Sequence, residues 1–188
     1  MYTYPHSINN NSGEELTFVR RARDEKGEYL EVTNKVKPGG GPPMHVHHYQ
    51  DEGLTVVKGR IGYQVQGQEP EFAEEGETVV FTAGTPHRFW NAGDDIMECT
   101  GFVRPPDNIE YFLGEIYAST ARNGGERPDS FDAAYLTKRY ESEFAMTDIP
   151  APVRTIVFPL MRAIGKLTGR YKKFADAPEP VRRKGVGR

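Results

Sequence analysis

Cysteine and long apolar runs are scarce in this chain, and each scarcity excludes a class of protein. The single cysteine, Cys99, excludes an intrachain disulfide and fits a reducing compartment. No apolar run approaches the roughly 20 residues that a membrane-spanning helix needs. The first fifteen residues are polar and lack the apolar core of a signal peptide. We therefore expect a cytoplasmic protein.

The chain also has almost no excess of positive or negative charge, since the net charge of the 188 residues is -3. This balance argues against nucleic acid as a partner and leaves a small-molecule ligand. The charge is nevertheless uneven. Residues 1–104 carry ten Lys and Arg against sixteen Asp and Glu, whereas residues 105–188 carry fourteen against eleven. Ten Phe and ten Tyr are enough for a packed core, so one domain with an extension is expected.

Four of the five histidines lie in two short stretches, Gly39–Gly59 and Gly76–Asn91. His45 and His47 are two residues apart, so on a strand they point to the same side. Glu52 begins the next extended segment and can meet them there, and the second stretch supplies His87. Imidazole nitrogens with one carboxylate oxygen suit a first-row divalent metal.

Both stretches resemble the two sequence motifs of the cupin superfamily. The matching positions are Gly39, His45, His47, Glu52 and Gly59 in the first motif, and Gly76, Gly84, His87 and Asn91 in the second. Thr82 departs from the pattern, since the family usually has a proline there, but that position belongs to a turn and holds no metal. The resemblance implies a metal held by His45, His47, Glu52 and His87, with one or two positions open. Fe, Mn, Ni, Cu and Zn all tolerate such ligands.

The resemblance covers residues 15–104 and implies an all-β core, a double-stranded β-helix or jelly-roll barrel. Alternating apolar residues and frequent turns in this range agree with it. Residues 1–14 are expected to be a flexible arm. Residues 105–170 change to helical periodicity and predict an α-helical C-terminal extension. Its helices are expected at 108–122, from 129 or 130 to 144, and at 153–167, the last kinked by Pro159. Residues 171–188 are expected to be a mobile basic tail.

The inner wall of the barrel can be predicted from strand alternation. If His87 faces inward, so does Phe89, and Ile61, Tyr63 and Met97 are expected on inner faces of their own strands. Such a wall suits a small aromatic or hydrophobic ligand. Tyr63, Phe89, Ile61 and Met97 are therefore candidate substrate-binding residues. The competing interpretation is that they are simply core, as most inward residues of small barrels are.

Small bacterial cupins of this kind resemble the quercetin-dioxygenase-like group, which implies a metal-dependent dioxygenase, an oxidoreductase. In that case Glu52 can also leave the metal and act as a base. One alternative is a redox-neutral isomerase or lyase with Tyr63 as proton donor. Another is a non-catalytic module that binds a small molecule, since one fold hosts many functions.

Residues 153–170 combine apolar and basic residues in the pattern of a cationic amphipathic helix. Such a helix can lie on an anionic membrane. Covering the open face of the barrel, or forming a dimer contact, is a commoner use, and these are favoured over membrane contact. A homodimer is expected because cupins commonly pair their barrels. The cluster Arg182–Arg183–Lys184 is expected to be a solvated end.

Overall fold

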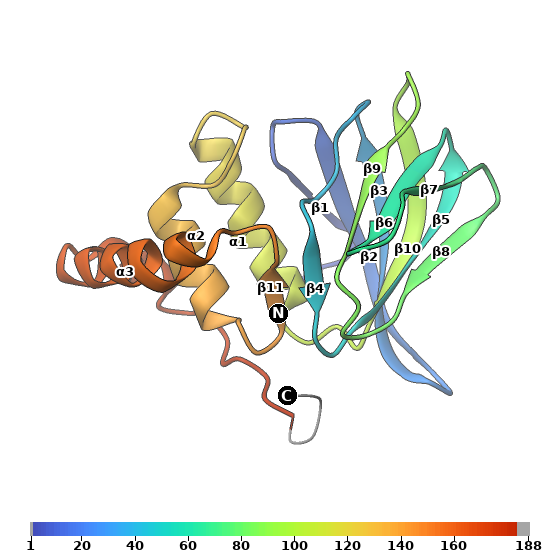
Figure 1. Cartoon of the computed structure of the whole chain (residues 1–188). Helices are drawn as coiled ribbons and strands as arrows, with labels where there is room; N and C mark the ends of the chain where they lie inside the picture. The colour runs from blue at the N-terminus through green and yellow to red at the C-terminus, as the bar shows by residue number, and fades with distance from the viewer. Residues whose placement is uncertain (1, 184–188) are drawn as a thin grey trace.

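The computed structural model describes residues 2–183, in which two antiparallel β-sheets face each other and a helical layer lies beside them (Figure 1). The strands are β1 (His6–Asn9), β2 (Glu14–Asp24), β3 (Gly27–Val36), β4 (His45–His47), β5 (Asp51–Lys58), β6 (Ile61–Val65), β7 (Glu71–Ala73), β8 (Thr78–Phe81), β9 (His87–Asn91), β10 (Met97–Arg104) and β11 (Phe144–Met146). One sheet has the order β1-β2-β3-β10-β5-β8 and the other β11-β4-β9-β6-β7. From β3 to β6, and again from β7 to β11, successive strands alternate between the sheets, as in a jelly roll. The predicted fold class is confirmed.

Strand alternation divides each sheet into an inner and an outer face. In β8, Val79 and Phe81 are buried while Val80 is exposed, and in β9 the buried His87 is followed by exposed Arg88. The buried side chains form two clusters. One fills the barrel interior, and the other lies between the larger sheet and the helices. The second cluster joins the helical extension to the barrel.

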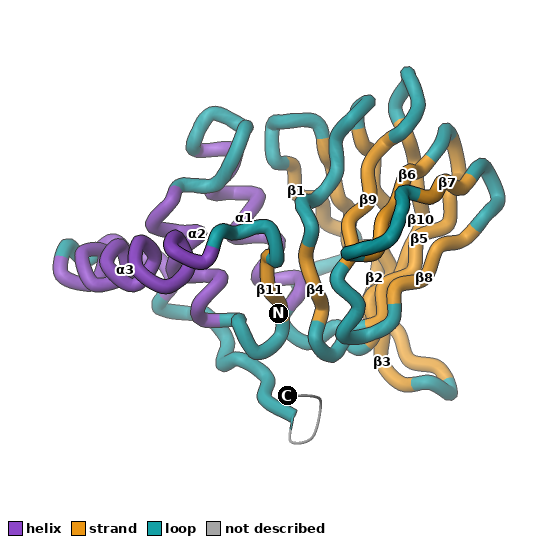
Figure 2. Tube along the Cα trace, viewed as in Figure 1, coloured by secondary structure: helices purple, strands orange, loops and turns teal. Residues whose placement is uncertain are grey.

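The helical layer consists of α1 (Ile109–Arg122), α2 (Ser130–Arg139) and α3 (Phe158–Leu167), drawn in purple in Figure 2. The Asp129 side chain caps α2 by accepting hydrogen bonds from the amides of Phe131 and Asp132. The prediction that this helix reaches Phe144 is wrong, because it ends at Arg139 and the chain turns into β11. The extension thereby adds a strand to the edge of β4.

The third predicted helix is present, but it begins as a π-helical segment, η1 (Val153–Val157). Pro159 lies in the first turn of α3, where the missing amide hydrogen has the smallest cost. The irregular turns lie before Pro159, whereas the sequence predicts a kink at Pro159 itself. A short 3₁₀ segment, η2 (Arg170–Phe174), follows. Among the helices in residues 2–183, none is long and apolar enough to cross a membrane.

Both ends of the described chain are more ordered than predicted. The expected flexible arm contains β1, which pairs with β2 from His6 to Asn9. The Asn10 side-chain carbonyl accepts hydrogen bonds from the amides that follow and fixes the turn between the two strands. The expected mobile tail is held by contacts with α2 and its C-terminal turn. Phe174 is buried, and the carbonyl of Pro178 accepts hydrogen bonds from Arg139 and Tyr140. Lys184 and the residues after it lie outside the described range.

Candidate metal centre

Four side chains from three strands converge on one point inside the barrel. His45 and His47 lie on β4, Glu52 on β5 and His87 on β9. One ligand atom from each residue lies within 4.8 Å of the others. Register explains the convergence, because His45 pairs directly with His87 across β4 and β9. All four ligands predicted from the sequence are therefore brought together.

Glu52 occupies the centre of this cluster. Its Oε2 lies 3.0 Å from Nε2 of His87, 3.5 Å from Nε2 of His47 and 3.8 Å from Nε2 of His45. All three imidazoles thus present the same nitrogen to one carboxylate oxygen. A donor set of three imidazoles and one carboxylate fits a divalent transition metal, so the residues can hold the ion that the resemblance implies.

Backbone carbonyls orient two of the three imidazoles. The Nδ1 atoms of His45 and His87 each lie 2.8 Å from a carbonyl oxygen, of Pro43 and Thr85 respectively. A carbonyl can only accept, so Nδ1 must carry the hydrogen and Nε2 is left with its lone pair toward the cluster. The buried Nδ1 of His47 has no partner among the described residues. This arrangement prepares Nε2 for a metal in two of the ligands.

Aromatic rings pack around the same imidazoles. The Phe81 ring stacks on His87 with centroids 3.8 Å apart, and the Phe144 ring meets His47 edge-on at 5.4 Å. Burial lowers the pKa of His47 to about 3, so its ring is neutral at physiological pH, as a metal ligand must be. The contacts with Phe81 and Phe144 restrict the rotation of the His87 and His47 rings.

The pKa of Glu52 results from opposing effects. Burial raises the pKa of this carboxyl, but the polar surroundings formed by the imidazoles of His45, His87 and His47 lower it more. The net result is a pKa well below the usual range. Glu52 is therefore ionised at neutral pH, which is the form that binds a cation.

A glycine in the preceding loop brings the cluster's backbone close to β9. Gly41 has φ +145°, and a Cβ built there would lie 2.2 Å from the carbonyl oxygen of Phe89. Only glycine permits this approach. The Gly39 amide donates a hydrogen bond to the Asn91 carbonyl, and the Asn91 amide donates one to the Gly40 carbonyl, so the loop is fixed to β9 just before His45 begins β4.

Three members of the cluster, His45, His47 and Glu52, lie in the wall of a cavity of about 90 Å³, several times the space that one water molecule needs. Most of the lining is apolar and comes from the larger sheet, β9, α1 and β11. The apolar lining residues are Leu16, Phe18, Val32, Pro42, Leu54, Phe89, Val103, Ile109, Phe112, Leu113, Phe144 and Met146. Among the described residues, no lysine or arginine lines it. The cavity therefore favours an uncharged, mostly apolar ligand.

Three polar residues of the cavity are not predicted from the sequence: Glu14, Asn34 and Tyr117. Burial raises the pKa of Glu14, and the hydrogen bond with the Tyr117 hydroxyl opposes this rise. Strand alternation could have identified Glu14, because this residue has the same parity as Leu16 and Phe18. Residues 1–14 are, however, predicted to be a flexible arm. Tyr117 lies in α1, within the helix predicted at 108–122. Its position over the barrel depends on tertiary packing.

The four predicted substrate-binding residues lie in different places. Phe89 lines the cavity, as alternation predicts. Ile61 and Met97 are fully buried in the cluster that fills the barrel interior and do not line the cavity. Tyr63 donates a hydrogen bond from its hydroxyl to Glu71 at the surface, 3.0 Å away. Of the four residues, the structure therefore brings only Phe89 to this cavity, and a substrate contact by Tyr63, Ile61 or Met97 stays a prediction.

Comparison with known proteins agrees with this geometry. Residues 32–103 match the family described as cupin domain. A short region is similar to the oxidoreductase iacF of Pestalotiopsis fici, at 38% identity over 50 residues, which is 27% of this chain and 24% of that protein. Another similarity is to the epoxidase atD of Aspergillus terreus, at 30% identity over 78 residues, 41% of this chain and 24% of that protein. The chain spans about a quarter of the length of these relatives.

Two solved structures are similar to part of this chain. A double-stranded β-helix protein of Klebsiella pneumoniae has 21% identity and a TM-score of 0.45, covering 55% of this chain and 79% of that one. KdgF from a Halomonas species has 19% identity and a TM-score of 0.47, covering 57% of this chain and 99% of that one.

Proposed function

Since residues 32–103 form a cupin domain, we propose that this protein is a metal-dependent oxidoreductase that acts on a small apolar or aromatic organic molecule. One observation carries the proposal: four ligand side chains converge, and three of them, His45, His47 and Glu52, line an apolar cavity. The short similarities to an oxidoreductase and an epoxidase support the same reaction class. A structural metal site would be closed by protein ligands, whereas this one faces open space.

His45, His47, Glu52 and His87 would hold the ion. A divalent transition metal bound there supplies Lewis acidity and, for Fe, Mn, Ni or Cu, a redox couple suited to reactions with dioxygen. The rings of Phe89 and Phe112 hold the apolar part of the substrate near the ligands. Helix α1 closes this end of the cavity and excludes water from it.

Polar groups at the cavity orient the substrate. The Glu14 carboxyl and the Tyr117 hydroxyl also line the cavity, and they suit one hydroxyl or carbonyl group of the substrate. Glu52, ionised and within the cluster, is the group placed to accept a proton from a substrate hydroxyl. Tyr63 has no such position, so the redox-neutral alternative loses its proposed proton donor.

The first test is the metal content of protein purified without a metal-affinity tag. His87→Ala removes one ligand, and His48→Ala is the matched control because His48 neighbours His47 yet stands outside the cluster. Near-stoichiometric Fe, Ni, Mn or Cu in the native protein and in His48→Ala, with loss in His87→Ala, supports the proposal. Zinc would favour isomerase or lyase chemistry. No metal in the native protein, even after reconstitution, contradicts it.

The second test is oxygen uptake by Fe-loaded and Ni-loaded protein with a panel of catechols and flavonols. Uptake that requires substrate and disappears in His87→Ala is the expected result. Tight binding of the same compounds without turnover would instead indicate a non-catalytic binding module.

A further inference from the structure

The helix α3 exposes an apolar face to solvent. Five of the ten large apolar residues that are exposed in the described chain lie between Ile156 and Leu167. Ile156 is 67% exposed, Leu160 60% and Leu167 88%, and Val157 and Ile164 lie beside them. At 100° per residue, Leu160, Ile164 and Leu167 fall on one side of the helix. A contiguous exposed apolar face of this kind marks an interaction surface.

This orientation of α3 is fixed by its opposite side. Gly165 is the buried residue of α3, and a Cβ built on it would lie 2.4 Å from the Tyr171 ring. The Tyr171 hydroxyl donates a hydrogen bond to the carbonyl of Met161, and its ring stacks on Tyr135 of α2. The predicted use of this helix as a cover for the barrel is wrong, because α1 and β11 line the cavity and α3 packs on α2.

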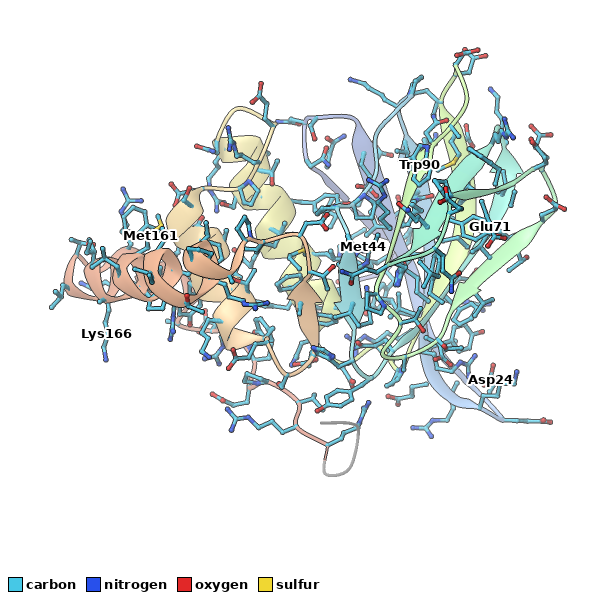
Figure 3. All side chains as sticks on the ribbon, viewed as in Figure 1. Asp24, Met44, Glu71, Trp90, Met161 and Lys166 are labelled. Atoms are coloured by element: carbon cyan, nitrogen blue, oxygen red, sulfur yellow. The ribbon has the colours of Figure 1, made fainter. Side chains whose placement is uncertain are left out.

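The charge around this face has one sign. Residues 151–175 contain six Lys and Arg and no Asp or Glu. Arg170 and Lys173 pair with aspartates of α2 and its cap. Arg154, Arg162 and Lys166 form no ion pair with any residue that the structure describes, and in Figure 3 Lys166 extends away from the body of the molecule. The surface therefore combines an apolar face with unneutralised positive charge.

We propose that η1 and α3 form an interfacial helix that docks on an anionic lipid surface. The apolar face enters the boundary between headgroups and acyl chains, and the basic side chains contact the acidic headgroups. Charge favours this occupant over a second copy, since packing two such faces together would oppose two basic segments. Residues 1–104 have sixteen acidic against ten basic residues, so the barrel is repelled by the same surface and α3 approaches first.

The test is flotation of the full chain with phosphatidylcholine vesicles, with and without about one third phosphatidylglycerol. We expect at least about tenfold more protein on the anionic vesicles, because each basic residue near the surface adds about 1 kcal/mol. Half-molar salt should remove most of this preference. Equal binding to both vesicle types, or to neither, overturns the proposal.

Two variants of α3 test its apolar face and its positive charge in turn. Leu160→Glu and Lys166→Glu are each expected to reduce flotation about tenfold. Val80→Glu is the matched control, because Val80 is also an exposed apolar residue but lies on the barrel; its flotation should equal that of the native protein. Circular dichroism and thermal unfolding verify that every variant is folded. A dimer in sedimentation that Leu160→Glu dissociates, with no flotation, assigns the face to a second copy and overturns the proposal.

Discussion

The ring of Phe144 lies edge-on to the imidazole of His47, with centroids 5.4 Å apart and an interplanar angle of 78°. Phe144 belongs to β11, beyond the two helices that follow the barrel, and pairs with His47 in the sheet. The extension thus contacts a metal ligand directly.

Phe144→Ala is expected to destabilise the protein by about 3–5 kcal/mol, because it removes a buried ring shared by the core and the cavity wall. Urea unfolding followed by fluorescence measures the change. Phe72→Ala is the control, since Phe72 is 47% exposed, and should cost much less. Equal stability of the two variants would show that β11 does not anchor the extension.

Metal removal is expected to lower the melting temperature. A ligand at about one hundred times its dissociation constant stabilises the folded state by about 2.7 kcal/mol, so chelation removes that amount. Glu52→Gln keeps the shape of the side chain and removes its charge, and the melting temperature of this variant should respond much less to chelator. A chelator effect of the same size in both proteins would place the metal elsewhere.

Tyr63→Phe is expected to leave metal content and turnover within about twofold of the native protein, because the hydroxyl contacts Glu71 at the surface. Phe89→Ala removes a ring from the cavity wall and should raise KM for an apolar substrate about tenfold or more. Steady-state kinetics on the two variants checks both statements. A large loss of kcat in Tyr63→Phe would return Tyr63 to the list of catalytic candidates.

Stability in acid is expected to depend on the pair formed by Asp24 and Arg104. Hydrogen bonds from Arg104 lower the pKa of Asp24 from 3.8 to about 2. Because the folded pKa is the lower one, the contribution of this pair is fully present above about pH 4 and is lost as the pH falls through 2. The stability difference between native protein and Asp24→Asn, measured by urea unfolding, should therefore shrink between pH 4 and pH 2. A difference that does not vary with pH would contradict this assignment.

The ligand cluster and the barrel could be predicted from the sequence because the two motifs resemble those of the cupin superfamily and because strand alternation is a local rule that agrees with them. Two-residue spacing fixes which side chains share a face of a strand, and this placed His45 with His47 and His87 with Phe89. For Tyr63 the same rule gives the face of the strand, which packs against the cluster in the barrel interior, but not which part of that interior the face reaches.

The cavity and the ends of the chain could not be predicted because they depend on contacts between distant segments. Glu14 meets Tyr117 only after α1 has packed over the sheet. The strand β11 has three residues, too few to show a period. The carbonyl groups of the tail accept hydrogen bonds from side chains of α2 and of the turn that follows α2, such as the bond from Arg139 to Pro178. No sequence pattern encodes such bonds.

Because β11 pairs with β4, the segment that matches the cupin domain family cannot be exchanged between proteins without residues that follow it. A chain cut after Arg104 would lose the strand that covers β4 and the helix that closes the cavity. The exposed edge would offer unpaired amides and carbonyls to other chains, which is a route to aggregation. Engineering by domain exchange therefore has to move the barrel and residues 105–146 together.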